Sequence, residues 1–293
     1  MKMDYYNNKV PTILSKFINN KQYIEAREVK NFHSYATTKS FKDICFKRIQ
    51  SIVKNKGDRK ITLLWSGGLD STLLFYLLLS TNVEFDMVMT EMSEVEHFDL
   101  YHDIDNYTHI TKIVLTSEEF MSHVSKYDKE KDLVITGDNG DQTFMSNLPM
   151  KYFKDVMHLP YRIVIPKDVY ESVSEHTDKV IYNKVNATVA NWCWALDFVY
   201  RWDVVNSLLS YELGFTLDNT PLVSFFHTDD FANYSVTNQV KNSKYDMYSD
   251  KCDMRKLIIR LCPKDENYVK NKTKVGSQKM FYFPKDYKRD YYA

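Results

Sequence analysis

Residues 66–71 read Ser-Gly-Gly-Leu-Asp-Ser, and their types and spacing suit the binding of phosphate groups. They join an apolar run at 61–65, typical of a strand, to a second apolar run at 69–80, typical of a buried helix. A helix start carries unpaired backbone N–H groups and partial positive charge, so it attracts phosphate. Glycines at 67 and 68 let this backbone approach phosphate oxygens with no side chain in the way.

An acid in this turn points to a metal ion. Asp70 would repel bare phosphate, but Mg²⁺ binds a carboxylate together with phosphate oxygens and could lie between them. Ser66 and Ser71 can add hydroxyl donors. The alternative is a tight turn in which Asp70 stabilises the first helical turn. The motifs Gly-x4-Gly-Lys-Ser/Thr and Gly-x-Gly-x-x-Gly do not occur, which argues against ordinary γ-phosphoryl transfer and dinucleotide binding.

A second polar segment, Thr136-Gly137-Asp138-Asn139-Gly140-Asp141-Gln142, ends another short apolar run. If that run is a strand parallel to 61–65, Asp70 and Asp141 face one crevice at the carboxyl ends of the strands. Two carboxylates there could hold one Mg²⁺ against a triphosphate. The alternative is that Asp-Asn-Gly-Asp is only a good turn sequence.

The elements that must position these segments follow from apolar periodicity. Strands are expected at 61–65, 85–92, 109–116 and 132–137, and helices at 10–56, 69–80 and 118–127. Strands alternating with helices predict an α/β fold with a parallel sheet covered on both faces. The expected organisation is an N-terminal helical segment at 1–59, an α/β nucleotide-binding core at 60–150 and a mainly helical C-terminal region at 151–293 that completes the site.

Residues 66–71 resemble the pyrophosphate loop of the N-type ATP pyrophosphatases, a family that includes asparagine synthetase, β-lactam synthetase and tRNA-thiolating enzymes. The resemblance implies an adenine nucleotide alpha hydrolase-like fold, with ATP and Mg²⁺ as cofactors. It also implies that ATP is split between its α and β phosphates while the loop holds the departing pyrophosphate. The nucleotide contacts implied in this way involve Leu64, Ser66, Gly67, Gly68, Asp70, Ser71, Met89 and Gly137, with Leu64, Met89 and Gly137 near the adenosine.

Residues 136–142 resemble the Ser-Gly-Glu-Gly-x-Asp-Glu segment of asparagine synthetase. That likeness implies that Asp141 is a second Mg²⁺ ligand beside Asp70. Asp138 takes the place of an active-site glutamate and would assist as a base or orienting group. Gln142 replaces the next acid of the family.

A further resemblance lies near the C-terminus, where the family has an Arg-x-Lys-x-Gly-Phe loop. Lys274 falls at the lysine that contacts the phosphates, and this implies a role in stabilising the transition state. Lys272 falls at the arginine, and Ser277 replaces the phenylalanine. The alternative is that this lysine-rich stretch is a solvated loop.

The function that the resemblance implies is an AMP- and pyrophosphate-forming ligase. It would adenylate a small-molecule carboxylate, which ammonia or an amine then attacks to form an amide. No cysteine precedes Cys45, so the glutaminase domain of the glutamine-dependent relatives is not expected here, and a separate glutaminase or nitrogen donor is the expected partner. Two alternatives remain, a relative that adenylates a nucleobase of tRNA or another nucleic acid, and a non-catalytic nucleotide-binding scaffold.

Composition limits the partners and the compartment. Lysine plus arginine equals aspartate plus glutamate at 39 each, so no overall field favours nucleic acid or an anionic membrane. The 4 cysteines form no Cys-x-x-Cys pair, as expected of free thiols in a reducing compartment. No signal peptide and no run of about 18 apolar residues are present, so a cytoplasmic protein without a membrane partner is expected.

Two further clusters have simpler interpretations. A polar stretch after the second strand is expected to be a solvated loop near the crevice, rather than a metal site, and contains Glu94, Glu96, His97, Asp99, His102 and Asp103. An aromatic cluster in a long apolar region is expected to pack in the core, rather than stack on bases, and contains Trp192, Trp194, Tyr200 and Trp202.

Overall fold

The computed structural model describes residues 37–144, 153, 155–181, 185–216, 219–238 and 251–272. The chain forms two compact units, which we call the sheet unit and the helical unit. The sheet unit contains the described residues of Ser40–Asp138, Asn206–Phe226 and Cys252–Ala293. The helical unit contains those of Met1–Lys39, Asn139–Val205 and His227–Lys251.

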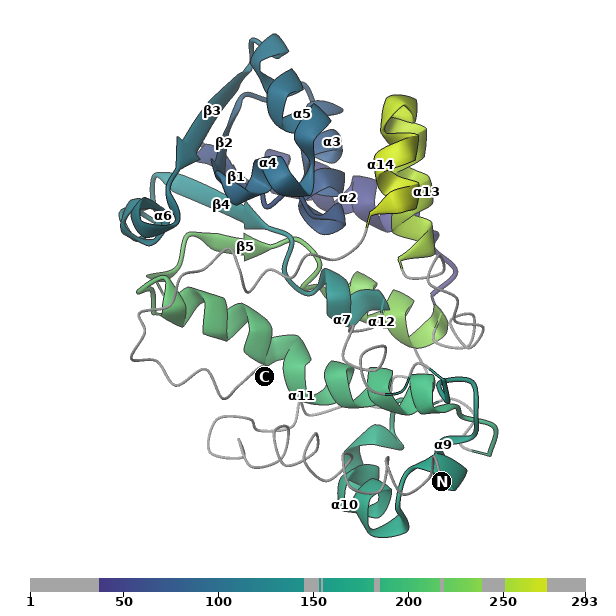
Figure 1. Ribbon diagram of the computed structural model, residues 1–293. Coiled ribbons are helices and arrows are strands. Elements are labelled where there is room, and N and C mark those ends of the chain that lie inside the picture. The colour runs from purple at the N-terminus through teal and green to yellow at the C-terminus, as the bar shows by residue number, and fades with distance from the viewer. Residues whose placement is uncertain are drawn as a thin grey trace. The chain divides into compact units, whose positions relative to one another are not determined.

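The sheet unit is built on a sheet of 5 parallel strands in the order β3-β2-β1-β4-β5 (Figure 1). The strands are β1 (Lys60–Leu64), β2 (Phe85–Thr90), β3 (Ile110–Leu115), β4 (Asp132–Thr136) and β5 (Leu222–Ser224). In the centre of the sheet, Thr62 of β1 is in register with Asp86 of β2 and Val134 of β4. The first four strands lie where the sequence predicts them, and β5 adds a strand from the region expected to be mainly helical.

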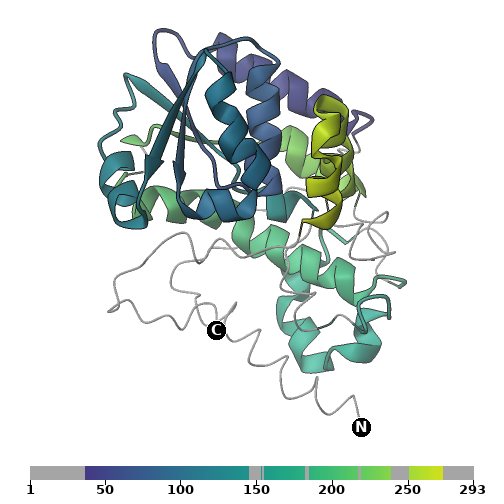
Figure 2. The same ribbon diagram turned by 45° about the horizontal axis from the view of Figure 1, so that its top comes forward.

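One face of the sheet is covered by α3 (Leu69–Leu79), which follows β1. Its residues from Leu69 to Leu78 are almost all buried, because α3 also contacts α2 (Phe41–Lys54) and α13 (Cys252–Leu261). Figure 2 shows the purple α2 beside the blue α3 on this side of the sheet. A helix enclosed in this way is apolar all round, as its sequence is.

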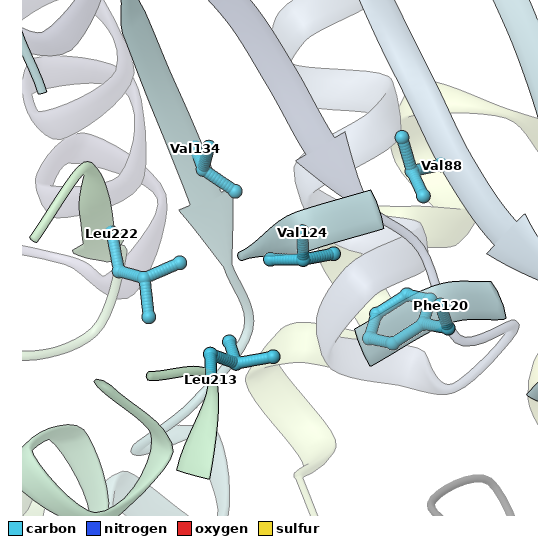
Figure 3. Close-up of a cluster of buried hydrophobic side chains, with 6 residues drawn as sticks. All are labelled: Val88, Phe120, Val124, Val134, Leu213 and Leu222. Carbon is cyan, nitrogen blue, oxygen red and sulfur yellow. The ribbon is translucent and has the colours of Figure 1, made fainter. Parts of the chain in front are cut away.

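The other face is covered by α6 (Ser117–Val124), which contacts β2 and β3. Thr116 and Glu119 form a capping box that starts this helix directly after β3. A hydrophobic cluster then joins α6 to the sheet and contains Val88, Phe120, Val124, Val134, Leu213 and Leu222 (Figure 3). Helices on both faces of a parallel sheet confirm the α/β fold.

Short helices complete the sheet unit. Between β2 and β3 lie α4 (Met92–Glu96), α5 (Phe98–Asp103) and the 3-10 turn η2 (Ile104–Asn106). After α13 come the 3-10 turn η5 (Pro263–Asp265) and α14 (Glu266–Asn271). The prediction of a solvated loop at 94–103 is wrong, because this stretch is helical and His97 is only 2% exposed.

The helical unit has an aromatic core. Its helices are α7 (Gly140–Phe144), α9 (Tyr161–Val164), α10 (Lys167–Thr177), α12 (Asp229–Asn238) and most of α11 (Val189–Glu212). Trp192, Trp194 and Trp202 are buried, and Trp194 donates a hydrogen bond to the Ser235 hydroxyl at 2.9 Å. The tryptophans are core residues, as predicted, whereas Tyr200 is only partly buried.

Two sequence-level expectations about the whole chain can be compared with the structure. All 4 cysteines are free thiols, with Cys45 and Cys193 buried. Among the described helices, none combines the length and the apolar character that crossing a membrane requires.

Candidate functional site

The candidate site lies at the carboxyl ends of β1 and β4, which are neighbours in the sheet. From β1 the chain adds β2 and β3 on one side, and it then returns to add β4 and β5 on the other. Ligands of open parallel sheets bind where the strand order reverses in this way, outside the carboxyl ends. The segments that follow these two strands are residues 65–71 and 137–138, which contain most of the predicted site residues.

The turn after β1 is braced by its own serines. The Ser66 N–H donates to the Ser71 hydroxyl at 3.2 Å, and the Gly68 N–H donates to the Ser66 hydroxyl at 3.3 Å. The Ser71 hydroxyl in turn donates to the Gly68 carbonyl at 3.2 Å. Both hydroxyls, predicted as donors to phosphate, therefore hydrogen-bond within the turn and hold its shape.

Gly68 is the N-cap of α3, with φ −78° and ψ 166°. Most helices place a serine, threonine or aspartate there, whose side chain accepts a hydrogen bond from an N–H group of the first turn. Glycine has no such side chain, so the N–H groups of the first turn of α3 remain suited to an anion from outside.

Close packing requires glycine at position 67. Its φ is +74°, a conformation that favours glycine. A β-carbon added there would lie 2.6 Å from the Cβ of Glu96 and 2.8 Å from the Ser93 carbonyl oxygen, so α4 leaves no room for a side chain.

The segment after β4 runs directly against the start of α3. A β-carbon added to Gly137 would lie 3.0 Å from the Cβ of Asp70 and 3.2 Å from the Ser71 nitrogen. The next carbonyl, that of Asp138, accepts a hydrogen bond from the Ser224 hydroxyl at the end of β5 at 2.8 Å. The structure thus brings Asp70 and its turn together with Gly137 and Asp138.

Leu64 and Met89 lie near the carboxyl ends of β1 and β2. The register pairs Leu64 with Val88, so Leu64 and Met89 are near neighbours at this edge of the sheet. The Met89 side chain is fully buried. The contact with adenosine that the resemblance implies for Met89 stays a prediction.

Asp141 belongs to the helical unit, where it lies on α7. Its carboxylate forms an ion pair with the buried Lys251 at 2.8 Å. Across the described ranges, no group of three or more histidine, cysteine or acidic residues is arranged as a metal site. A single carboxylate with phosphate oxygens suffices for Mg²⁺, and Asp70 at the glycine turn fits that role. The pairing of Asp70 with Asp141 stays a prediction.

Sequence reasoning missed an acid beside Asp138. Glu212 is the last residue of α11. Burial raises the pKa of Glu212, and the charge of Asp138 raises it further. Glu212 lies 74 positions from Asp138 in the printed numbering, and no local sequence signal links them.

Sequence reasoning also missed a buried ion pair next to the turn. The Lys272 ammonium is hydrogen-bonded to the Glu96 carboxylate and lies 2.7 Å from the Glu96 carbonyl oxygen. Each of the two side chains is only 9% exposed. Burial lowers the pKa of Lys272, although the Glu96 carboxylate acts in the opposite direction. Lys274 and Ser277, singled out in the sequence, lie outside the described residues.

α14 reaches the turn through Tyr268. The Tyr268 hydroxyl donates to the Gly67 carbonyl at 2.6 Å, and its ring stacks on His97 with centroids 3.6 Å apart. His97 Nε2 lies 3.1 Å from Asp265 Oδ2, which also accepts from the Tyr76 hydroxyl at 2.5 Å.

The site is therefore a glycine turn opening a buried helix, with Asp70 in the first helical turn, Asp138 after β4, and Glu212 at the end of α11, whose pKa the charge of Asp138 raises. Such a site can bind an anion through backbone N–H groups and a divalent cation through Asp70.

No protein-family model matches the chain, and no curated protein matches its sequence.

Proposed function

We propose that the protein is an ATP-dependent synthetase that forms AMP and pyrophosphate and adenylates a carboxylate for amide formation. The observation that carries this proposal is the geometry at the switch point of the sheet. There a glycine turn opens α3, and Gly137 packs against Asp70 at the first turn. The resemblance of residues 66–71 to the pyrophosphate loop of the N-type ATP pyrophosphatases supports it.

In the proposed reaction, a carboxylate oxygen of the substrate attacks the α phosphorus of ATP. The bond from that phosphorus to the bridging oxygen breaks, and pyrophosphate leaves. Ammonia or an amine then attacks the acyl carbon, AMP leaves, and the nitrogen loses a proton. Each step creates charge at the phosphates or at the acyl oxygen, so donors placed in advance lower the barrier.

Different residues of this chain are proposed to bind the phosphates, contact the adenosine and offset the charge. N–H groups at residues 67–70 bind the pyrophosphate part, and Leu64, Met89 and Gly137 offer backbone to the adenosine. A Mg²⁺ ion held by Asp70 would offset phosphate charge, and Asp141 would join it by exchanging its ion pair with Lys251. Lys274 would add positive charge at the transition state.

The proton of the attacking amine needs an acceptor. Asp138 is proposed as this base or as the group that orients the amine. Glu212 is a second candidate for this role, because burial and the charge of Asp138 raise its pKa. An acid with a raised pKa accepts a proton more readily near neutral pH.

Exchange of labelled pyrophosphate into ATP tests this function. We expect Mg²⁺-dependent exchange that appears only when a suitable carboxylate is added from a panel of amino acids and other small acids. Exchange that needs RNA instead would favour the nucleobase-modifying alternative. Absence of exchange with every acceptor, together with ATP binding, would contradict the synthetase.

The second candidate is a non-catalytic nucleotide-binding scaffold. The ion pair between Lys251 and Asp141 favours it, because the buried Lys251 ammonium already pairs with the carboxylate that is proposed as a metal ligand. Lys251→Ala distinguishes the two. In a synthetase it changes the Mg²⁺ concentration needed for exchange, whereas in a scaffold it affects only stability.

A further inference from the structure

We propose that Tyr268 is a positioning residue for the phosphate loop, because its hydroxyl fixes the peptide plane between Gly67 and Gly68. This inference rests on the proposed function for its consequence in binding. Its structural part stands on the described contacts alone. It assigns to α14 the task of holding the loop in the conformation that binds the pyrophosphate part of ATP.

One peptide group, between Gly67 and Gly68, receives the hydrogen bond from Tyr268. The Tyr268 hydroxyl donates to the Gly67 carbonyl at 2.6 Å across 201 positions of the chain. In a planar trans peptide, the carbonyl and the following N–H point in opposite directions. Holding the Gly67 oxygen toward α14 therefore directs the Gly68 N–H away from α14, where its nitrogen lies 3.3 Å from the Ser66 hydroxyl oxygen.

The loop by itself is free to change its conformation. A glycine pair has access to many backbone conformations, so the plane between Gly67 and Gly68 can rotate unless another group holds it. The hydrogen bond from the Gly68 N–H to the Ser66 hydroxyl is long, at 3.3 Å between nitrogen and oxygen. The hydrogen bond from the Tyr268 hydroxyl to the Gly67 carbonyl is short, at 2.6 Å. The tyrosine is the stronger constraint on this peptide.

Tyr268 is itself held in place by its neighbours. Its ring stacks on His97 at an interplanar angle of 18°, and the Lys272 ammonium lies 5.4 Å from its centroid. Burial raises the pKa of the Tyr268 hydroxyl, a hydrogen bond with Thr72 acts in the opposite direction, and nearby carboxylates, first Glu96, raise it. The net shift is upward, so the hydroxyl keeps its proton and remains a donor. The stacking and the cation leave the ring little freedom to turn away.

The same C-terminal segment also contacts α3 at a second point. Asp265, just before α14, accepts a hydrogen bond from Tyr76 in the middle of α3. Tyr268 therefore acts at the start of α3 and Asp265 two turns later. Of these two bonds, the one from Tyr268 reaches the loop, so the bond from Tyr76 to Asp265 offers a comparison away from it.

The charge of the Glu96 carboxylate beside the loop is compensated by Lys272. Glu96 lies against Gly67, where an uncompensated carboxylate would repel phosphate. Lys272 pairs with that carboxylate in a nearly buried position. α14 and the residue after it thus supply both the tyrosine that orients the loop and the cation that neutralises its acidic neighbour.

The test compares Tyr268→Phe with Tyr76→Phe. Both variants remove one tyrosine hydroxyl that donates a hydrogen bond, but only the first removes the bond to Gly67. The chain has only 7 glycines, so ¹⁵N-glycine labelling gives a small set of amide signals, and Gly68→Ala identifies that of Gly68. The readouts are Gly68 amide exchange with deuterium and calorimetric affinity for pyrophosphate with Mg²⁺.

We expect Tyr268→Phe to speed the exchange of the Gly68 amide about five-fold and to weaken pyrophosphate binding about five-fold, as loss of one hydrogen bond implies. Tyr76→Phe should leave both within about two-fold, even if its melting temperature falls further. Equal changes in the two variants, or an unchanged Gly68 amide in Tyr268→Phe, would overturn the inference.

The two proposals fail in different ways. If the wild-type protein binds neither ATP nor pyrophosphate, the proposed function is wrong, while the Gly68 amide still decides whether Tyr268 fixes the peptide. If the wild type binds pyrophosphate and Tyr268→Phe binds it equally well, the positioning role is wrong and the proposed function stands.

Discussion

Gly137 and Asp70 approach each other so closely that a β-carbon on Gly137 would lie 3.0 Å from the Cβ of Asp70. This contact joins the segment after β4 to the first turn of α3. It places Asp138 next to the glycine turn.

Gly137→Ala should damage the site by steric conflict. The added methyl group would also meet the Ser71 nitrogen at 3.2 Å, so the first turn of α3 has to move. We expect a loss of about 1–3 kcal/mol in the free energy of unfolding and ATP binding at least about ten-fold weaker. Urea denaturation and calorimetry measure the two effects.

The control is Gly57→Ala. Gly57 also has a positive φ, +59°, but a β-carbon there meets no atom within 4 Å. It should cost about 1 kcal/mol of stability through backbone strain and leave ATP affinity unchanged. If both variants bind ATP normally, the contact of Gly137 with Asp70 has no part in the site.

Asp70→Asn should preserve the fold and abolish Mg²⁺-dependent release of pyrophosphate. The amide keeps the size of the side chain but loses the charge that a metal needs. A fall of about 100-fold or more in turnover is expected, the scale on which one lost charge-stabilising group acts. Release of pyrophosphate from ATP with Mg²⁺ varied is the measurement.

Asp99→Asn is the matched control, because Asp99 is also the acid in the first turn of a helix but is exposed. Any loss of stability that comes only from removing a negative charge at a helix N-terminus should appear in both variants. Wild-type turnover in Asp70→Asn would refute the metal role.

The ion pair of Lys272 with Glu96 should behave as a buried pair. Lys272→Met and Glu96→Gln should each cost about 3 kcal/mol, because each leaves one buried group without its partner. The double variant should cost less than either single change. A double-mutant cycle by urea denaturation gives the coupling energy.

The same helix offers an exposed comparison. Lys270 and Glu266 form an i,i+4 pair at 2.6 Å with both side chains more than half exposed. Lys270→Met should cost less than about 0.5 kcal/mol. Equal costs at positions 270 and 272 would show that burial of the Lys272 pair has no energetic effect.

Asp265 should make stability depend on acid pH. Burial alone would raise the pKa of Asp265, but hydrogen bonds from His97 and Tyr76 hold it below its ordinary value. Below the unfolded pKa of about 3.9, the unfolded chain binds more protons, so lowering the pH favours unfolding. The stability that Asp265 contributes is therefore complete above that value and is lost as the pH falls through the folded pKa.

Asp265→Asn should flatten this acid limb of the stability profile, measured by urea denaturation in steps between about pH 2 and pH 5. Tyr76→Phe, a milder change, should reduce its slope in part. Asp105→Asn, at a carboxylate whose side chain is 66% exposed, should leave the limb as it is in the wild type. A limb of unchanged slope in Asp265→Asn would contradict the assignment.

Much of the sheet unit could be predicted from local patterns. The apolar runs at 61–65 and 132–137 predict β1 and β4, and the apolar residues at 69–80 predict α3. Strand β5 was missed because its 3 residues are too few to show a period. The long apolar region at 185–213 contains the single helix α11.

Polar residues were the source of the clearest error. Glu96 and His97 were interpreted as part of a solvated loop, because charged and imidazole groups are usually exposed. In the structure they are buried against Lys272 and Asp265, whose positions are 176 and 168 residues away. Burial of a polar group depends on such a partner, and no local pattern identifies one.

The sequence by itself determined the strand, the glycine turn and the helix that carries Asp70, because periodicity and glycine placement act over a few residues. Tertiary structure alone decided that Gly137 meets Asp70, that Glu212 lies by Asp138 and that Tyr268 holds Gly67. The physical reason is that these contacts join residues far apart in the chain, and packing of the sheet with its helices determines which of them meet.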